Sequence, residues 1–235
     1  MEIITFGDHT KPAIVFLHGW GGGFSSFIYF AKVMAKNFYC IVCDFNDLIN
    51  SDKVLGVKDF ADALYIKLAD LKIKEICLVG HSFGGRVAGK FAFLYPKLVK
   101  KIILVDSAGL PPRRNLWYYI KVKRYKLYKW LAGKGLMKKE KLLKFGSTDF
   151  KNLKPELRAT FIKIVNEDLT NCFSSITCPT LIYWGEKDKD TPIYMAKKLN
   201  KIIKDSGLVV VKNAGHYSYL EDVNKFIIVM NKFLI

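Results

Sequence analysis

The sequence alternates between short apolar runs and longer segments of mixed polarity, and this alternation restricts the possible folds more than any other feature. Six runs are apolar and largely β-branched: Ala13–Leu17, Tyr39–Cys43, Ile76–Val79, Ile102–Val105, Thr180–Trp184 and Leu208–Val211. Their near-continuous hydrophobicity is typical of strands that are buried on both faces of a sheet. Segments long enough for crossover helices lie between or after them, at 25–36, 57–71, 83–95, 192–204 and 219–233. We therefore predict an α/β fold with a mostly parallel, doubly wound sheet.

Two local patterns refine this expectation. The run Glu2–Phe6 predicts one additional strand at an edge of the sheet. Thr191 stands directly before Pro192, a pair that predicts the N-cap and the first turn of the helix at 192–204. The 235 residues are 51% hydrophobic and 25% charged, which supports one sizeable core and excludes a disordered or collagen-like chain.

The alternation breaks once, between Ser107 and Cys178, where about seventy residues contain no apolar β-type run. Apolar residues recur there near helical spacing, at Leu116, Ile120, Leu127 and Leu131 and, after a possible helix start at Pro155-Glu156, at Leu157, Phe161 and Ile164. We expect residues 107–178 to form a helical cap over the ends of the sheet. The cap would be inserted into an α/β core made of residues 1–106 and 179–235.

The compartment can be inferred from apolar runs and cysteines. No apolar run approaches the roughly 20 residues that a membrane span requires, and the start Met1-Glu2-Ile3 lacks the basic region of a signal peptide. The five cysteines are an odd number, at Cys40, Cys43, Cys77, Cys172 and Cys178. Cys40 and Cys43 form a C-x-x-C pair inside an apolar run, whereas a redox pair needs a helix N-terminus. We expect reduced core cysteines and a cytoplasmic protein.

The strongest chemical signal is the segment Gly80-His81-Ser82-Phe83-Gly84, which follows one predicted strand and precedes a predicted helix. In that context G-x-S-x-G is typical of a nucleophile elbow, a strained turn that exposes its serine. The alternative is that Ser82 only caps the helix. A serine hydroxyl is a weak nucleophile at neutral pH, so a base and an orienting acid must come from elsewhere in the chain.

His216 is the best candidate for the base among the four histidines. It lies in the loop after the last predicted strand, at the carboxyl edge of the sheet. His9 lies in the N-terminal turn, while His18 and His81 belong to glycine-rich motifs and are better suited to holding loops.

Three aspartates compete for the role of the acid that would fix the imidazole tautomer. Asp188 follows the strand Thr180–Trp184 and gives the chain order Ser, Asp, His. Asp190 lies two residues later, and Asp106 follows the strand Ile102–Val105. We favour Asp188 for its position relative to the strand, although each carboxylate could simply be a solvated loop residue.

The glycine-rich segment His18-Gly19-Trp20-Gly21-Gly22-Gly23 follows the first core strand and can approach a substrate closely with its backbone. We expect the amides of Trp20 and Phe83 to form an oxyanion hole. The segment lacks the patterns of phosphate-binding and dinucleotide-binding loops, so no nucleotide cofactor is expected. No metal is expected either, because no two histidines have a metal-like spacing.

Together these motifs resemble the α/β-hydrolase superfamily, and the resemblance covers nearly the whole chain. The matching motifs are His18-Gly19-Trp20-Gly21-Gly22, Gly80-His81-Ser82-Phe83-Gly84-Gly85, Trp184-Gly185-Glu186-Lys187-Asp188 with Pro192, and Gly215-His216. The resemblance implies a hydrolase with a Ser82, Asp188 and His216 triad and a helical lid, similar to carboxylesterases, pimeloyl-carrier-protein methyl ester esterases and carbon–carbon bond hydrolases of dienoate catabolism.

We interpret the chain as a serine hydrolase that cleaves a carboxylic ester or a related small acyl substrate through an acyl-enzyme. One alternative is a carbon–carbon bond hydrolase of the dienoate type, although those enzymes often have Asn where this chain has His81. Another is a ligand-binding member of the fold that has no turnover. The sequence predicts neither the identity of the substrate nor the oligomeric state.

The positive charge is concentrated in the expected cap. The chain has 38 basic and 21 acidic residues, a net charge of +17, and the segment from Arg113 to Lys154 alone contributes +12. This segment could be an ordinary solvated surface, or it could attract an acidic carrier protein, an anionic substrate or an anionic membrane. Nucleic acid is not an expected partner, because no nucleic-acid-binding motif accompanies the charge.

Overall fold

A computed structural model describes residues 1–113, 116–138, 150 and 153–235. Its seven strands are β1 (Glu2–Phe6), β2 (Ala13–Leu17), β3 (Tyr39–Asp44), β4 (Ile76–His81), β5 (Val99–Val105), β6 (Thr180–Gly185) and β7 (Ser206–Val211). They form one sheet in the order β1-β3-β2-β4-β5-β6-β7. Only β1 runs antiparallel, paired with β3, and β2 to β7 are parallel neighbours throughout. The predicted α/β class is confirmed, and the predicted edge strand forms.

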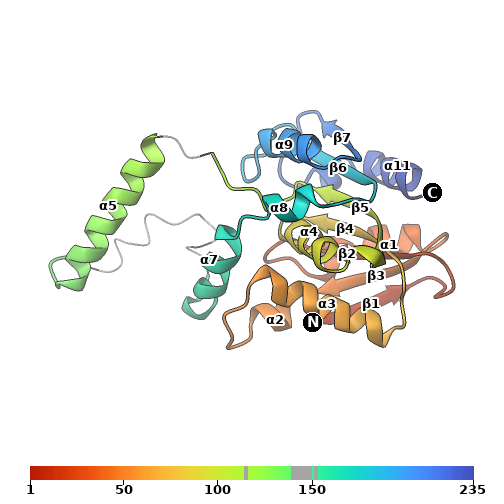
Figure 1. The fold of residues 1–235 in the computed structure, drawn as a ribbon, viewed down its shortest axis with the longest axis horizontal. Helices are drawn as coiled ribbons and strands as arrows, with labels where there is room; N and C mark the ends of the chain where they lie inside the picture. Colours follow the sequence, from red (N-terminus) through yellow and green to blue (C-terminus); the bar gives the residue numbers. More distant parts are fainter. Residues whose placement is uncertain (114–115, 139–149, 151–152) are drawn as a thin grey trace.

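Helices cover both faces of this sheet (Figure 1). The described helices are η1 (Phe24–Ser26), α1 (Ile28–Met34), α2 (Asn46–Ile49), α3 (Val57–Asp70), α4 (Phe83–Leu94), η2 (Pro96–Leu98), α5 (Leu116–Gly133), η4 (Pro155–Leu157), α7 (Arg158–Asn166), α8 (Thr170–Ser174), α9 (Tyr194–Ile202), α10 (Ser218–Glu221) and α11 (Val223–Leu234). One hydrophobic cluster joins the sheet to α3, α4, α8 and α9, and a second joins it to α1, α10 and α11.

The two clusters explain why the core strands lack polar alternation. Successive side chains of a strand point to opposite faces, so Val15 packs in one cluster and its neighbours Ile14 and Phe16 pack in the other. All three are fully buried. Both faces of the central strands therefore require apolar residues.

Some helix boundaries differ from those that the sequence predicts. The segment 25–36 starts with the short turn η1 before α1, and the C-terminal segment divides into α10 and α11 around Asp222. The predicted N-cap at Thr191 is wrong, because α9 begins at Tyr194 and its N-cap residue is Ile193. Thr191 instead bonds to residues near the ends of β5 and β6, as described below.

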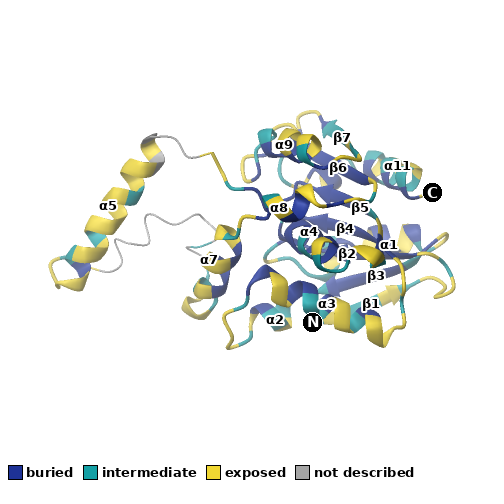
Figure 2. Ribbon diagram, in the orientation of Figure 1, coloured by how far each residue is buried: buried dark blue, intermediate teal, exposed yellow. Residues whose placement is uncertain are grey.

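The insertion between β5 and β6 is helical in its described part, which contains α5, η4, α7 and α8 and no strand. In Figure 1, α7 and α8 lie beside the core, whereas α5 lies apart from the sheet and does not cover its edge. Figure 2 shows that most of α5 is exposed along its length. The division into a core and a separate cap at residues 107–178 stays a prediction.

The surface and the cysteines fit this layered core. All five cysteines are free, and four of them are buried. Burial raises the pKa of Cys40 and of Cys43 to about 12, so this C-x-x-C pair has no reactive thiolate.

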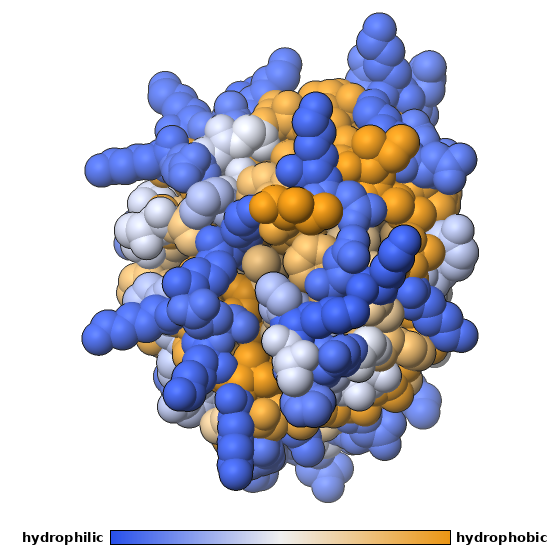
Figure 3. All heavy atoms as spheres, turned by 90° about the vertical axis from the view of Figure 1, so that its right-hand side faces the viewer, coloured by the Kyte–Doolittle hydropathy of each residue, from blue (hydrophilic) through white to orange (hydrophobic). Residues whose placement is uncertain are grey.

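In Figure 3, on the side of the core away from α5, apolar patches reach the surface between projecting hydrophilic side chains. Within the described ranges, no helix combines the length and the apolar character needed to cross a membrane.

Candidate active site

Ser82 occupies a strained turn between β4 and α4. Its φ of +50° is rare for a residue with a side chain, and its amide donates a hydrogen bond to the carbonyl oxygen of Val105 at 3.0 Å. The turn depends on glycine: a Cβ at Gly80 would lie 2.5 Å from the Gly84 oxygen, and a Cβ at Gly84 would lie 2.0 Å from the Leu17 oxygen. The Ser82 side chain makes no capping bond to the helix, which contradicts the simple N-cap interpretation.

The hydroxyl of Ser82 instead faces His216 in the loop after β7. The distance from Ser82 Oγ to His216 Nε2 is 3.0 Å, and His216 Nδ1 lies 2.8 Å from Asp188 Oδ2. The carboxylate comes from the loop after β6, at the same edge of the sheet. The three predicted residues thus form one continuous hydrogen-bonded chain, although 134 residues separate Ser82 from His216.

The electrostatics of the hydrogen-bonded residues Asp188, His216 and Ser82 favour proton transfer through the imidazole. Burial would raise the pKa of Asp188, but hydrogen bonds from His216 and Thr191 outweigh it and lower that pKa below its usual value. Burial would lower the pKa of His216, but its hydrogen bond to Asp188 and the charges of nearby aspartates outweigh it and raise that pKa. The site therefore stabilises an imidazolium next to an ionised carboxylate.

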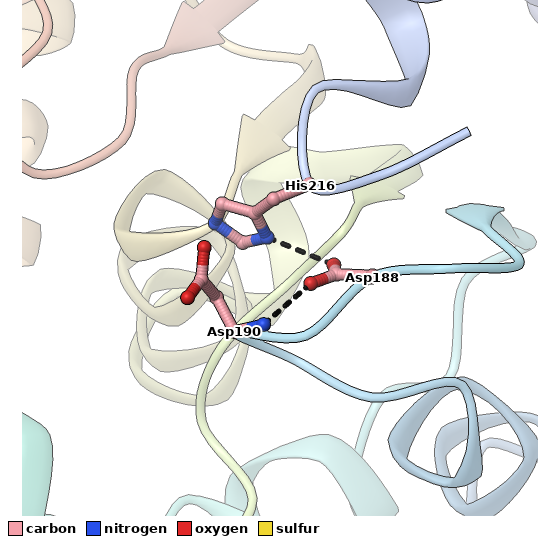
Figure 4. Close-up of side chains that lie close together, drawn as sticks. All are labelled: Asp188, Asp190 and His216. Atoms are coloured by element: carbon pink, nitrogen blue, oxygen red, sulfur yellow. Dashed lines mark hydrogen bonds and ion pairs between the residues drawn. The ribbon is translucent and has the colours of Figure 1, made fainter.

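Asp190, the first rival acid, also lies close to the imidazole but plays a different part. Its backbone amide donates to Asp188 Oδ1 at 2.8 Å (Figure 4), while the residue itself is exposed. Its charge contributes to the raised pKa of His216. Asp190 thus acts on the imidazole through its charge, whereas Asp188 holds Nδ1 directly.

Asp106, the more distant rival, is fully buried and bonds away from His216. Its Oδ1 accepts the Gly185 amide at 2.8 Å, and its Oδ2 accepts the amide and the hydroxyl of Ser218 at 3.1 and 2.6 Å. Burial raises the pKa of Asp106 to about 7 against these hydrogen bonds. Asp106 joins the end of β6 to the start of α10, and so it fixes the loops that carry Asp188 and His216.

Thr191 is a site residue that the sequence analysis assigned to another role. Its amide donates to Asp188 Oδ1 at 2.9 Å. Its hydroxyl lies 2.7 Å from Asp188 Oδ2 and 3.0 Å from the carbonyl oxygen of Asp106, and it can donate its one proton to either. The only signal in the sequence is that Thr191 lies three residues after Asp188. Pro192, which follows it, favours the interpretation of Thr191 as a helix N-cap instead.

The ligand atoms of Asp188, Asp190 and His216 lie within 4.8 Å of one another, so in the described residues they form a group that could hold a cation. Asp188 Oδ2 and His216 Nδ1 are already 2.8 Å apart, in a hydrogen bond that requires a proton between them (Figure 4). A metal ion would have to displace that proton and break the contact. The group is therefore better suited to proton transfer than to metal binding.

The glycine-rich loop after β2 lines the same cavity as His216. His18 fixes it: His18 Nδ1 lies 2.7 Å from the Gly19 oxygen, and His18 Nε2 accepts the Phe45 amide at 3.0 Å. Burial lowers the pKa of His18, which fits this neutral tautomer. In the part of the chain that the structure describes, the amides of Trp20 and Phe83 have no hydrogen-bond acceptor. Both remain available to a bound oxygen atom, as the predicted oxyanion hole requires.

His81 supports the loop on the other side of the serine. Its Nε2 lies 2.8 Å from the carbonyl oxygen of His216, so it donates a hydrogen bond that fixes the His216 backbone. Burial lowers the pKa of His81 to about 3, and the ring stays neutral. His81 therefore holds a loop and does not take up a second proton at neutral pH.

A cavity of about 660 Å³ opens in front of Ser82. Its lining is mixed: the charged residues Arg86, Glu167, Asp168 and Asp190 lie beside the apolar or aromatic residues Trp20, Phe83, Ala108, Leu110, Pro111, Pro112, Phe161, Ile164, Val165 and Met195. The Trp20 ring packs edge to face against Phe83 and Phe161, at centroid distances of 5.7 and 5.1 Å. Helix α7, which carries Phe161, therefore forms one wall of the cavity.

Charged residues from α4 hold this wall in place. The buried Arg86 guanidinium donates to the carbonyl oxygens of Val165 at 3.2 Å and Glu167 at 2.9 Å. The side chain of Glu167 bonds Lys90 at 2.9 Å and accepts the amide of Val57 at 3.3 Å. Burial lowers the pKa of Arg86 only to about 10, so the guanidinium stays charged. No sequence motif indicated this clamp, because its partners lie about 80 residues apart.

Comparisons with known proteins agree with this geometry. The family model described as alpha/beta hydrolase fold matches residues 12–134 and 118–223. AB hydrolase superfamily protein YisY of Bacillus subtilis (strain 168) is 28% identical, over 92% of this chain and 89% of its own length. Lipase 1 of Psychrobacter immobilis is 26% identical, over 93% of this chain and 75% of its own length. The crystal structure of the enol-lactonase from Burkholderia xenovorans LB400 has a TM-score of 0.75 at 19% identity and covers 99% of this chain and 95% of that one.

Proposed function

Because the chain belongs to the alpha/beta hydrolase fold family, we propose that it is a serine hydrolase that cleaves a carboxylic ester or a related small acyl substrate. The hydrogen-bonded chain from Asp188 through His216 to Ser82, with Ser82 and His216 lining a partly apolar cavity, is the observation that carries this proposal. Lipase 1 of Psychrobacter immobilis is a relative whose name fits the same reaction class. The proposal needs no metal or cofactor, and it keeps the expectation of a cytoplasmic protein.

In the proposed reaction, Ser82 Oγ attacks the ester carbonyl while His216 Nε2 takes the serine proton. Asp188 keeps the Nδ1 proton in place and stabilises the imidazolium that forms. The amides of Trp20 and Phe83 stabilise the negative charge on the carbonyl oxygen. His216 then gives its proton to the leaving alcohol, and an acyl group remains on Ser82.

Water completes the cycle by the same route. His216 takes a proton from a water molecule, and the resulting hydroxide attacks the acyl carbonyl. Collapse of the second tetrahedral intermediate releases the acid and returns the proton to Ser82. The same three residues therefore serve acylation and deacylation.

The apolar part of the lining can hold an uncharged acyl group, whereas the acidic side chains of Glu167, Asp168 and Asp190 disfavour a carboxylate. The guanidinium of Arg86 reaches the cavity, but it already donates to two backbone carbonyl oxygens. A carbon–carbon bond substrate of the dienoate type usually presents a carboxylate, and no cation in the described lining is free of such a backbone bond. Ester hydrolysis is therefore the function that the site supports better.

The experiment compares the wild-type protein with Ser82→Ala on a series of p-nitrophenyl esters of increasing chain length. Loss of the nucleophile should reduce kcat by about 10⁶-fold. Ser174→Ala, an exposed serine on α8, is the matched control and should keep wild-type activity. Ester turnover that survives in Ser82→Ala would exclude the proposed mechanism. A wild-type protein that cleaves a dienoate ring-fission product but no ester would favour the carbon–carbon reaction, and one that cleaves neither would favour a binding protein.

A further inference from the structure

Helix α5 carries large apolar side chains that no part of the core covers. Trp117, Ile120, Leu127 and Trp130 follow one another at intervals of three, seven and three residues, which places them on one side of the helix. Their exposed fractions are 75%, 37%, 53% and 55%. Isolated apolar residues are common on protein surfaces, but a stripe that includes two exposed tryptophans marks an interaction surface.

The same helix is strongly cationic. Its five basic side chains are all exposed: Lys121, Lys123, Arg124, Lys126 and Lys129. No Asp or Glu occurs anywhere from residue 113 to residue 138. Lys134, just beyond the helix, lies with its Nζ 4.6 Å from the centre of the Trp130 ring. The helix therefore combines an apolar stripe with uncompensated positive charge.

The arrangement of these charges suits a flat partner. Lys121 and Lys126 lie at the two edges of the apolar stripe and Lys129 lies on the opposite side of the helix, while Lys123 and Arg124 lie among the residues of the stripe. Long basic side chains can keep their charged ends in water while their stems lie along an apolar surface. In Figures 1 and 2, α5 stands apart from the core with its exposed surface accessible along its length.

We propose that α5 binds the surface of an anionic lipid bilayer. The helix would lie in the plane of the interface, with Trp117, Ile120, Leu127 and Trp130 toward the acyl chains. The lysines and Arg124 would contact the anionic headgroups, and the two indole rings would sit at the boundary between headgroups and hydrocarbon.

A bilayer fits these residues better than a soluble acidic protein does. From Trp117 to Trp130 the stripe extends about 20 Å along the helix, with cations at its edges and within it. A bilayer offers an apolar layer and negative charge together along that whole length. An acidic protein surface offers the charge but leaves the tryptophans exposed or poorly packed.

Co-sedimentation of the 235-residue protein with phosphatidylcholine vesicles, with and without phosphatidylglycerol, tests the proposal directly. The wild-type protein should bind the anionic vesicles much more tightly than the neutral ones, and binding should weaken as salt rises. Its tryptophan fluorescence should shift to shorter wavelength on binding, because Trp117 and Trp130 leave water. The readout is binding, so it does not depend on the proposed ester hydrolysis.

Two variants separate the charge from the apolar stripe. The charge reversal Lys121→Glu, Lys126→Glu and Lys129→Glu should weaken binding by at least about tenfold. Trp117→Ala with Trp130→Ala should also weaken it and should abolish the fluorescence shift. Both sets lie on a helix outside the core, and circular dichroism should confirm that the fold is retained.

A matched charge reversal on the core controls for net charge. Lys197, Lys201 and Lys204 are exposed residues on or just after α9, and their replacement by Glu should leave most of the binding. Equal losses in the two charge reversals would overturn the proposal in favour of non-specific attraction. Binding that survives the tryptophan replacements unchanged would also overturn it, as would binding to an acidic acyl carrier protein with none to vesicles.

Discussion

The two carboxylates that flank His216 differ in what they contact. Asp188 accepts a hydrogen bond from the imidazole at 2.8 Å and is buried, whereas Asp190 presents its backbone amide to Asp188 and leaves its own carboxylate exposed. A hydrogen bond fixes the tautomer of the ring, while a nearby charge only changes its proton affinity. The two residues should therefore respond differently to the same substitution.

Asp188→Asn should lower kcat by about 10⁴-fold, because the amide would stabilise the wrong tautomer of His216. Asp190→Asn preserves the backbone amide that bonds Asp188 and should lower kcat only slightly at high pH. Steady-state kinetics of the two variants on one ester checks the ranking. A larger loss of kcat in Asp190→Asn than in Asp188→Asn would show that Asp190, and not Asp188, orients the imidazole.

The pH dependence of turnover should report the raised pKa of His216. Only the neutral imidazole can take the serine proton, so kcat/KM should fall as the pH decreases through that pKa, with a midpoint above 6.5. Asp190→Asn removes one of the charges that raise the pKa and should move the midpoint to lower pH. A wild-type midpoint below 6.5, or a midpoint that Asp190→Asn leaves in place, would contradict the electrostatics described here.

Thr191→Val should lower kcat by about tenfold, because a hydrogen bond to a charged group contributes about 1.5 to 3 kcal/mol and Asp188 would lose one. The replacement keeps the shape of the side chain and the backbone amide. Thr191→Ser restores the hydroxyl and should recover most of the activity, which separates the hydrogen bond from packing. Wild-type kinetics in Thr191→Val would show that the hydroxyl does not position Asp188.

Individual site residues were predictable from sequence to the extent that each has a local motif. Ser82 has flanking glycines, and Asp188 and His216 follow strands, so their convergence at one sheet edge could be expected. The roles of Thr191 and Asp106 could not, because their hydrogen bonds cross between loops that are 85 and 112 residues apart. Such bonds are set by the packing of whole strands.

At the scale of elements, the turn from β4 to α4 depends on close contact with β2. Gly84 lies so near the end of β2 that a Cβ would reach within 2.0 Å of the Leu17 oxygen, a backbone atom that cannot rotate away. Strand β2 also leads into the loop with Trp20, so the contact sets the distance between the two amides of the proposed oxyanion hole.

Gly84→Ala should therefore destabilise the fold by about 1 to 3 kcal/mol or more, as overpacking does in a rigid core. Urea unfolding followed by circular dichroism measures the change. Gly207→Ala on β7 is the matched control, because a Cβ there meets no atom within 4 Å, and it should change the stability little. Equal stability of Gly84→Ala and the wild-type protein would refute the close-contact account.

The elements themselves were largely predictable, and the errors have a common cause. Continuous apolar runs identified the core strands, since both faces of the sheet are covered. The predicted helix N-cap at Thr191 does not form, because the Thr191 hydroxyl lies within hydrogen-bond distance of the Asp188 carboxylate and the Asp106 carbonyl oxygen instead. The clamp of α7 by Arg86 left no local pattern, as its acceptors are backbone carbonyl oxygens on a distant helix.

At the scale of the whole molecule, the charge and the chemistry lie in different parts. Of the net charge of +17, +12 falls between Arg113 and Lys154. Within that segment, helix α5 and its five basic residues lie apart from the layered core that holds Ser82 and His216 (Figure 1). The sequence reveals this concentration of charge. It does not reveal that α5 stands apart from the sheet, because helical periodicity identifies an apolar side without identifying what covers it.

If Ser82 carries the acyl group during turnover, as proposed, that acyl-enzyme can be trapped. The protein is mixed rapidly with p-nitrophenyl acetate and quenched in acid, and the masses of its peptides are then measured by mass spectrometry. We expect an acetyl group on the peptide that contains Ser82 and none in Ser82→Ala. An acetyl group on another residue during full turnover, or turnover in Ser82→Ala, would contradict it.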